Sequence, residues 1–237
     1  MSTKISVCMA AYNGQKYIRQ QILSILSQLT QSDELIIVND CSNDRTIQVI
    51  NEIKDIRINV INNDVNIGVI RSFEKSISCA SGDIIFLSDQ DDIWMANKVI
   101  EIIAAFDRDK KVTIVVSDAM LIDGDGEKIN ESFFATTGKF HSGILKTILK
   151  NRYLGCTLAF KKEMIENILP FPNGIPMHDI WIGIVNDIYG KSYYINKPLV
   201  KYRRHELNVT SLSSNNMLKA IKYRISLVKA ISCLLNK

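Results

Sequence analysis

Short apolar runs alternate with amphipathic stretches along the first 94 residues. Residues 5–9, ISVCM, are mostly apolar, as in a short buried strand, and apolar side chains recur at helical spacing after Asn13 and Gly14. The alternation continues with predicted strands at 34–38, 58–62 and 83–87 and predicted helices at 44–53 and 69–80. Strands that alternate with helices predict an α/β fold with a mainly parallel sheet covered by helices.

The pattern is less regular beyond Trp94. It predicts a helix at 95–106, a strand at 112–117, a turn at 123–126, and irregular chain to about Tyr153. It then predicts a strand and a helix in GCTLAFKKEMIENIL, a helix that ends at Gly190, and a strand over 191–205. We interpret residues 1–211 as one domain with two halves, 1–94 and 95–211, followed by a distinct segment at 212–237.

The composition is that of a soluble globular protein. Apolar residues make up 46% of the chain and charged residues 23%, a balance that excludes disorder. The sequence has no run of about 18 apolar residues and no secretory signal, so we expect a cytoplasmic protein. Five scattered cysteines without a C-x-x-C pair predict reduced thiols. The net charge of +4 is modest, and we expect no nucleic-acid partner.

The C-terminal segment is basic. Between Leu212 and Lys237 there are five basic residues and no acidic residue. Apolar residues recur there at helical spacing, namely Met217, Leu218, Ile221, Ile225, Val228, Ile231 and Leu235. Such an amphipathic helix either packs on its own domain or lies on an anionic membrane surface, and we favour the membrane.

Polar clusters follow three predicted strands: AYNG, NDCSND and SDQDD. Open α/β sheets bind ligands beyond the carboxyl ends of their strands, so we expect these clusters to form one site. Asp40, in the second cluster, has two interpretations. It is a turn residue, or it accepts a hydrogen bond from a pyrimidine N–H while Tyr12 lies against the base.

The third cluster places three carboxylates, Asp89, Asp91 and Asp92, within four positions. Capping of the next helix would need only one of them. Carboxylates that converge at a strand end repel each other unless a cation is bound, and hard divalent cations take oxygen ligands. The cluster therefore predicts metal or nucleotide binding.

The sequence DGDGEKINESFF, from Asp123, begins like a calcium-binding loop. Lys128 and Phe134 occupy its sixth and twelfth positions, where glycine and glutamate are required. We therefore interpret it as a hairpin turn.

Two further polar residues come from the second half. His205 follows Arg203 and Arg204, and this group suits an anionic diphosphate or, for His205, a metal ion. Asp179 begins a predicted helix, where capping explains it as well as catalysis does.

Taken in order, these motifs resemble the family 2 glycosyltransferases, inverting enzymes of the GT-A fold that use nucleotide-sugar donors. The resemblance spans about 200 residues and rests on SVCMAAYNGQKYI, ELIIVNDCSNDRT, NIGVIRSFEKSIS, SGDIIFLSDQDDIW, GCTLAFKK, MHDIWIGIV and YRRHELNVT. It implies a Rossmann-like sheet with a nucleotide-sugar-binding half at 1–94 and an acceptor half at 95–211.

The resemblance also implies residue roles. Asp89 and Asp91 would form the family's D-x-D pair, with Asp91 as a direct ligand of Mg²⁺ or Mn²⁺ and Asp89 near the ribose or the metal's waters. We add His205 to the predicted metal ligands. Asp179 would be the general base, preceded here by His178 where most members have Glu. The predicted nucleotide-sugar site comprises Ala10, Tyr12, Asp40, Asn66, Gly68, Arg71, Asp89, Gln90 and Arg203.

The HD pair and the later YR-x-H-x-x-N resemble a bacterial branch that includes rhamnosyltransferases of O-antigen and capsule assembly. This implies dTDP-rhamnose or a UDP-hexose as donor, a lipid-diphosphate-linked saccharide as acceptor, and a place at the inner face of the membrane. A nucleotidyltransferase is disfavoured because AAYNGQKY provides no glycine-rich phosphate cradle. A non-catalytic nucleotide-sugar-binding subunit is disfavoured because Asp40, Asp89, Asp91, Asp179 and His205 occur together.

Overall fold

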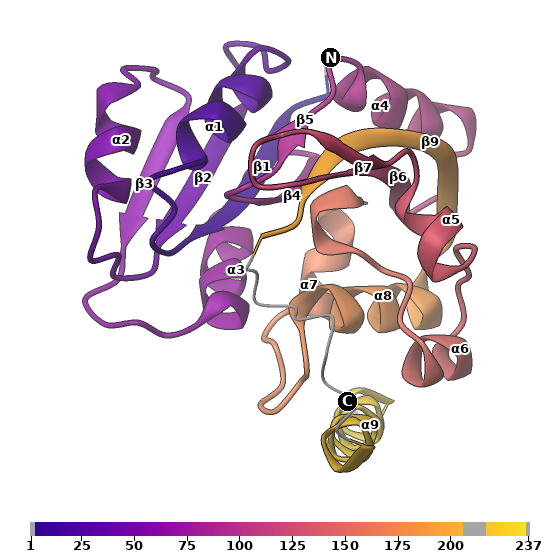
Figure 1. Cartoon of the computed structure of the whole chain (residues 1–237). Coiled ribbons are helices and arrows are strands. Elements are labelled where there is room, and N and C mark those ends of the chain that lie inside the picture. Colours follow the sequence, from indigo (N-terminus) through magenta and orange to yellow (C-terminus); the bar gives the residue numbers. More distant parts are fainter. Residues whose placement is uncertain (1–2, 206–216, 236–237) are drawn as a thin grey trace.

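A central sheet lies between two layers of helices in the computed structural model, which describes residues 3–205 and 217–235 (Figure 1). Within these residues the sheet has nine strands in the order β3-β2-β1-β4-β8-β6-β9-β5, with β7 beside β6. The strands are β1 (Ile5–Ala11), β2 (Glu34–Asn39), β3 (Ile58–Asn62), β4 (Ile84–Asp89), β5 (Ile93–Trp94), β6 (Ile114–Ile122), β7 (Lys128–Asn130), β8 (Leu158–Lys161) and β9 (Ser192–Arg203). The α-helices are α1 (Ile18–Leu26), α2 (Thr46–Glu52), α3 (Val69–Ser78), α4 (Lys98–Arg108), α5 (Phe133–Thr137), α6 (Ile144–Leu149), α7 (Ile165–Ile168), α8 (His178–Tyr189) and α9 (Met217–Leu235).

The first half follows the predicted alternation. Strands β3, β2, β1 and β4 run parallel to one another. The side chains of β1, β2 and β4 are buried on both faces, whereas those of the edge strand β3 are only partly buried. In β1, Val7 and Met9 join the core under α1 and α4, while Cys8 joins the core under α3 and α8. The continuous apolar runs are therefore explained by two helical layers that exclude water from both faces of the sheet.

The second half makes the sheet mixed rather than mainly parallel. Strand β8 pairs antiparallel with both β4 and β6, and β9 runs parallel to β6 and antiparallel to β5. The two-residue strand β5 was not predicted, because two residues are too few to show a periodicity. The predicted hairpin is confirmed, since β6 and β7 pair antiparallel across the DGDG turn.

Helix α9 packs on its own domain through one face. Leu227, Ala230 and Ile231 are buried, and Leu227 and Ile231 cluster with Ile184 of α8 and with α6. Figure 1 shows α9 at the edge of the molecule, beyond α6 and α8. The predicted boundary between residues 211 and 212 lies outside the described residues, as do the side chains of Met217, Leu218 and Lys237.

Within the described residues, every helix is too short or too polar to cross a membrane.

Candidate active site

The loops after β1 and β4 are tied together by Gln90. Its Oε1 accepts a hydrogen bond from the Tyr12 amide and its Nε2 donates one to the Tyr12 carbonyl, each at 2.9 Å. A Cβ at Gly14 would overlap with the Gln90 side chain and displace it from this position. Ala10 pairs with Asp89 in the sheet register. The Tyr12 side chain is 45% exposed at this edge, available to a ligand.

Asp40 is buried and shapes the loop before α3. Its Oδ1 accepts hydrogen bonds from the Asn63 side chain and the Ile67 amide, both at 2.9 Å, and its Oδ2 accepts one from the Gly68 amide at 2.8 Å. Gly68 has a φ of +85°, which favours glycine. Asn66 donates to the Asp40 carbonyl. Asp40 thus holds Asn66 and Gly68 beside the site, and its contact with a base stays a prediction.

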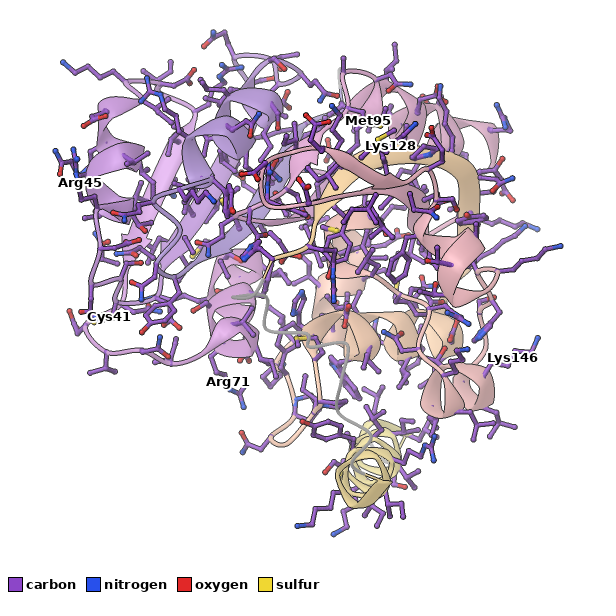
Figure 2. The ribbon with its side chains drawn as sticks, viewed as in Figure 1. Cys41, Arg45, Arg71, Met95, Lys128 and Lys146 are labelled. Carbon is purple, nitrogen blue, oxygen red and sulfur yellow. The ribbon has the colours of Figure 1, made fainter. Side chains whose placement is uncertain are left out.

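Arg71 is directed at a different part of the chain. It forms an ion pair with Glu74, donates to the Phe171 carbonyl at 2.9 Å, and also contacts Asn173. Figure 2 shows Arg71 at the end of α3 that lies nearest the segment before α8. These contacts fix α3 against that segment, and a donor contact by Arg71 stays a prediction.

The structure brings Asp91 and His205 together across 114 positions of sequence. The His205 Nε2 lies 2.8 Å from the Asp91 Oδ2, and their side chains are 15% and 13% exposed. A carboxylate beside an imidazole at the surface of a site is a ligand pair that suits Mn²⁺.

Arg203 is buried beneath the loop that carries Asp91. Its Nε donates to the Asp91 carbonyl at 2.8 Å, and its amide donates to the Asp92 Oδ1 at 2.9 Å. The guanidinium also lies 4.5 Å from the centre of the Tyr17 ring. Only 2% of Arg203 is exposed. Its observed contacts are those of a residue that positions the acidic loop, and a direct donor contact stays a prediction.

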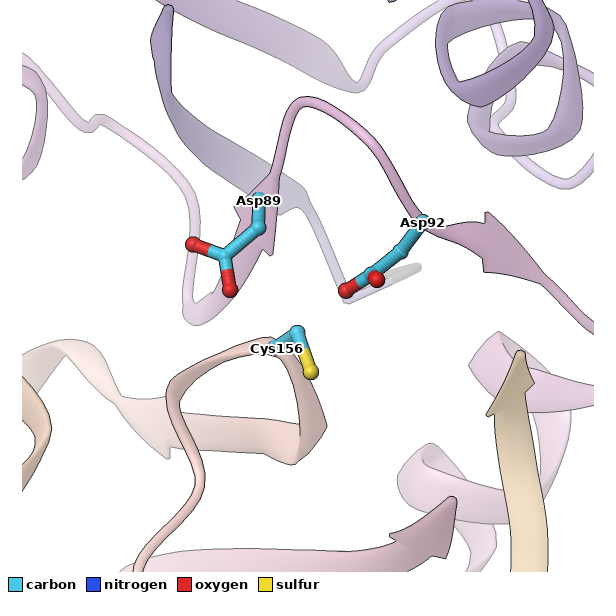
Figure 3. A group of neighbouring side chains, drawn as sticks. All are labelled: Asp89, Asp92 and Cys156. Carbon is cyan, nitrogen blue, oxygen red and sulfur yellow. The ribbon is translucent and has the colours of Figure 1, made fainter. Parts of the chain in front are cut away.

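Asp89, Asp92 and Cys156 meet below this loop, with one ligand atom of each within 4.8 Å of the others (Figure 3). Burial raises the pKa of Asp89 to about 7, and the charges of Asp91 and Asp179 act in the same direction. Burial also raises the pKa of Cys156 far above its ordinary value, so its thiol keeps its proton. A protonated thiol is a poor ligand. The donor set that remains consists of carboxylates and an imidazole, which fits Mn²⁺ or Mg²⁺.

Sequence reasoning missed Lys98 as part of this cluster. The side chain is fully buried, and its Nζ donates to the Cys156 carbonyl at 2.7 Å and lies 4.1 Å from the centre of the Trp94 ring. Burial lowers the pKa of Lys98 to about 7, while Asp92 and Asp89 favour its charged form. Lys98 is therefore a buried amine beneath the carboxylates that loses its proton near neutral pH. A lysine in an amphipathic helix gives no sequence signal for such a place.

Lys98→Met should lower the free energy of unfolding by roughly 2 to 4 kcal/mol at pH 7, because it leaves the buried Cys156 carbonyl without its hydrogen-bond donor and the ionised form of Asp89 without a buried countercharge. This loss in the free energy of unfolding should be smaller near pH 5, because the carboxyl groups are then protonated. Urea unfolding at pH 7 and at pH 5 measures the loss. Lys110→Met is the control, because the Lys110 side chain is 77% exposed and should contribute less than about 0.5 kcal/mol. Equal losses in both variants would contradict the role of Lys98.

Asp179 lies in the first turn of α8 and is 8% exposed. Its Oδ2 accepts a hydrogen bond from the Gly155 amide at 3.1 Å, and its Oδ1 accepts one from the Ile180 amide at 2.6 Å. Burial raises the pKa of Asp179 to about 7. A carboxylate with this pKa can accept a proton near neutral pH. The charge of Asp179 also acts on Asp89, so the predicted base and the predicted metal site are close.

His178 has a packing role. Its ring stacks on Phe73 with 3.9 Å between centres, and burial lowers its pKa to about 3, so the imidazole is neutral. His178 therefore places an uncharged ring in the core between α3 and α8. The role of Asp179 as general base stays a prediction.

Parallel strands that end in a carboxylate cluster, extended by a second mixed half, define a GT-A type transferase. The chain belongs to the glycosyl transferase family 2, whose family model matches residues 6–169. The sequence-based assignment to this family is confirmed.

Several relatives are similar over most of the chain. One is the UDP-Glc:alpha-D-GlcNAc-diphosphoundecaprenol beta-1,3-glucosyltransferase WfaP of Escherichia coli, which is 35% identical over 92% of this chain and 86% of its own length. Another is the putative teichuronic acid biosynthesis glycosyltransferase TuaG of Bacillus subtilis, 28% identical over 92% of this chain and 84% of its own length. Other relatives are longer proteins than this chain. The match covers 66% of the length of an uncharacterized Nostoc glycosyltransferase and 36% of the length of one from Haemophilus influenzae.

Solved structures share the fold. TarS of S. aureus in complex with UDP-GlcNAc has a TM-score of 0.73 at 16% identity, covering 95% of this chain and 66% of TarS 1–349. The mannosyltransferase PcManGT of Pyrobaculum calidifontis, in complex with GDP-Man and Mn²⁺, has a TM-score of 0.67 at 14% identity, covering 98% of this chain and 65% of that chain.

Proposed function

We propose that this protein transfers a hexose from a nucleotide diphosphate sugar to a hydroxyl of a lipid-diphosphate-linked saccharide, with inversion at the anomeric carbon. The donor is a UDP-hexose or dTDP-rhamnose, and we rank UDP-glucose first among these candidates. The product belongs to a bacterial surface polysaccharide such as O-antigen or capsule. The observation that carries the proposal is the convergence of Asp89, Asp91 and His205 with Asp179 at the carboxyl edge of the sheet.

Each side chain has a distinct task in this reaction. Tyr12 lies against the base, and Asp40 holds the loop with Asn66 and Gly68 around the nucleotide. Asp91 and His205 would hold Mn²⁺ or Mg²⁺, which when bound would offset negative charge on the leaving diphosphate. Asp179 accepts the proton of the attacking hydroxyl.

Two relatives support the choice of donor and acceptor. WfaP and WfgD of Escherichia coli are both named for transfer from UDP-Glc to a GlcNAc-diphosphoundecaprenol in a beta-1,3 linkage. The α-linked glucose of UDP-glucose gives a β-linkage after one inverting displacement, as the single base Asp179 would produce. Such an acceptor is held in a membrane, so we place this protein on the cytoplasmic side, at the inner face of the cell membrane.

A donor screen tests the proposal. The purified protein is incubated with UDP-glucose, UDP-galactose, UDP-GlcNAc and dTDP-rhamnose, a synthetic lipid-diphosphate-GlcNAc acceptor, and either Mn²⁺ or a chelator. We expect one donor to be consumed in a Mn²⁺-dependent way, and NMR of the product to show an inverted anomeric carbon. Donor binding without turnover would instead identify a binding subunit. In a separate incubation with a nucleoside triphosphate and a sugar phosphate, release of pyrophosphate would identify a nucleotidyltransferase.

The transfer rate should depend on pH through Asp179. Because burial raises the pKa of Asp179 to about 7, the carboxyl group is protonated below that pH and cannot accept the hydroxyl proton. We expect the turnover number to rise about tenfold per pH unit below pH 7 and to level off above it. The measurement is made at saturating donor and Mn²⁺, which keeps protonation of Asp89 from limiting the rate. A flat profile between pH 5 and 8 would contradict the assignment.

A further inference from the structure

We propose that α6 and α9 together form a docking surface for an anionic lipid bilayer. The surface, called here the α6–α9 surface, consists of the exposed apolar side chains Leu145, Leu149, Ile221, Ile225 and Val228 and the basic side chains around them. It deepens the proposed function by specifying how the protein reaches a lipid-linked acceptor. Its binding to lipid can be measured without any transferase activity.

The apolar part is unusually exposed. Leu145 and Leu149 of α6 are 77% and 67% exposed, while Ile225 and Val228 of α9 are each 51% exposed. In α6 the inward direction is already taken by Ile144 and Ile148, which pack toward α8 and α9. The two leucines therefore point outward from a helix whose inner face is satisfied by packing.

Helix α9 carries two apolar stripes. Leu227, Ala230 and Ile231 are buried on one face. At about 100° per residue, Ile221, Ile225 and Val228 share a second face, turned away from the first. Packing on the domain requires only the inner stripe. The outer stripe is the part that stays exposed to solvent among the described residues.

The outer stripes of the two helices belong to one surface. The Arg224 Nη2 donates a hydrogen bond to the Leu149 carbonyl at 3.2 Å, which joins α9 to the end of α6. Ile144 and Ile148 of α6 cluster with Leu227 and Ile231 of α9. Figure 1 shows both helices at the same edge of the molecule, away from the sheet.

The charge of this surface favours a bilayer over a second copy of the chain. Residues 144–150 and 221–235 include five basic residues and no acidic one, namely Lys146, Lys150, Lys222, Arg224 and Lys229. Figure 2 shows Lys146 extending outward from α6. In a twofold dimer the same patch meets itself, so these cations would repel. Anionic lipid headgroups attract them, while the apolar stripes enter the acyl boundary.

Docking through this surface would fix the catalytic residue relative to the membrane. Helix α8 carries Asp179 in its first turn and Ile184, under α9, in its middle. The membrane-facing surface and the predicted base are thus connected by one rigid helix.

Vesicle co-sedimentation of the full chain tests the proposal. The vesicles contain either phosphatidylcholine alone or phosphatidylcholine with phosphatidylglycerol. The variants are Leu145→Ser with Leu149→Ser, Ile225→Ser with Val228→Ser, and Lys222→Gln with Lys229→Gln. Ile100→Ser is the matched control, because Ile100 is 71% exposed on α4 at the opposite edge of the molecule.

We expect the wild type to bind the anionic vesicles and not the neutral ones. Each double substitution of apolar residues should reduce the partition coefficient of the protein on anionic vesicles by roughly tenfold or more. The lysine pair should reduce it on anionic vesicles only, and the control should bind as the wild type does. Donor hydrolysis in solution should be unchanged in all variants, while transfer to a membrane-embedded acceptor should fall with binding.

Three results would overturn the proposal: absence of wild-type binding to anionic vesicles, equal loss in Ile100→Ser, or a dimer in solution that the α6–α9 variants dissociate. If the protein binds vesicles as expected but neither the wild type nor any variant turns over a donor, the proposed function fails while the docking surface stands.

Discussion

Asp179→Asn is expected to reduce sugar transfer by a factor of about 10² to 10⁴ while leaving donor affinity nearly unchanged. An asparagine side chain is close in size and can still accept the hydrogen bond from the Gly155 amide, although it loses the one from the neighbouring Ile180 amide, so the protein should stay folded. It cannot take up a proton at neutral pH. The variant should therefore bind donor and fail in the chemical step, and its remaining activity should lose the pH dependence near 7.

Donor titration calorimetry and single-turnover kinetics separate these effects. Asp187→Asn is a matched control on the same helix, since Asp187 accepts hydrogen bonds from Tyr153 at 2.6 Å and Thr147 at 3.0 Å, neither of which belongs to the predicted site. The control should be less stable than the wild type. Its turnover per bound donor should be unchanged. If Asp179→Asn loses donor affinity as much as rate, Asp179 is a binding residue and the base lies elsewhere.

Asp91→Asn is expected to abolish transfer without lowering stability. The charge of Asp91 acts with burial to raise the pKa of Asp89, so removing that charge relieves repulsion in the metal-free protein. The same substitution removes a carboxylate ligand, while the asparagine oxygen can still accept a hydrogen bond from the His205 Nε2. The melting temperature without metal should therefore be unchanged or higher, and the rise that Mn²⁺ produces in the wild type should disappear.

Thermal unfolding with increasing Mn²⁺ measures both effects, and a transfer assay at saturating Mn²⁺ measures the loss of activity. Asp125→Asn serves as the control, because Asp125 is an exposed carboxylate in the hairpin turn between β6 and β7. Its response to Mn²⁺ should match that of the wild type. Near-normal turnover in Asp91→Asn at saturating Mn²⁺ would remove Asp91 from the metal site.

The local sequence pattern determined the first half of the fold. Each strand from β1 to β4 is a short apolar run followed by polar residues, and each helix shows its own periodicity, so neighbouring residues carry the information. Parallel strands share one carboxyl edge, and for that reason the sequence alone predicts that the clusters with Tyr12, Asp40 and Asp89 lie together. The motif order was also sufficient to identify the family.

The tertiary structure decided what depends on residues far apart in the chain. The insertion of β8 between β4 and β6 depends on pairing partners that a local periodicity does not encode. The burial of Arg203 under Asp91, 112 positions away, and of Lys98 under Cys156, 58 positions away, depends on how the two halves pack. Desolvation sets the pKa of Asp179, and it too arises only when α8 packs in place. For α9 the sequence showed apolar residues at helical spacing, but only packing against α6 and α8 separated the stripe that is buried from the stripe that is exposed.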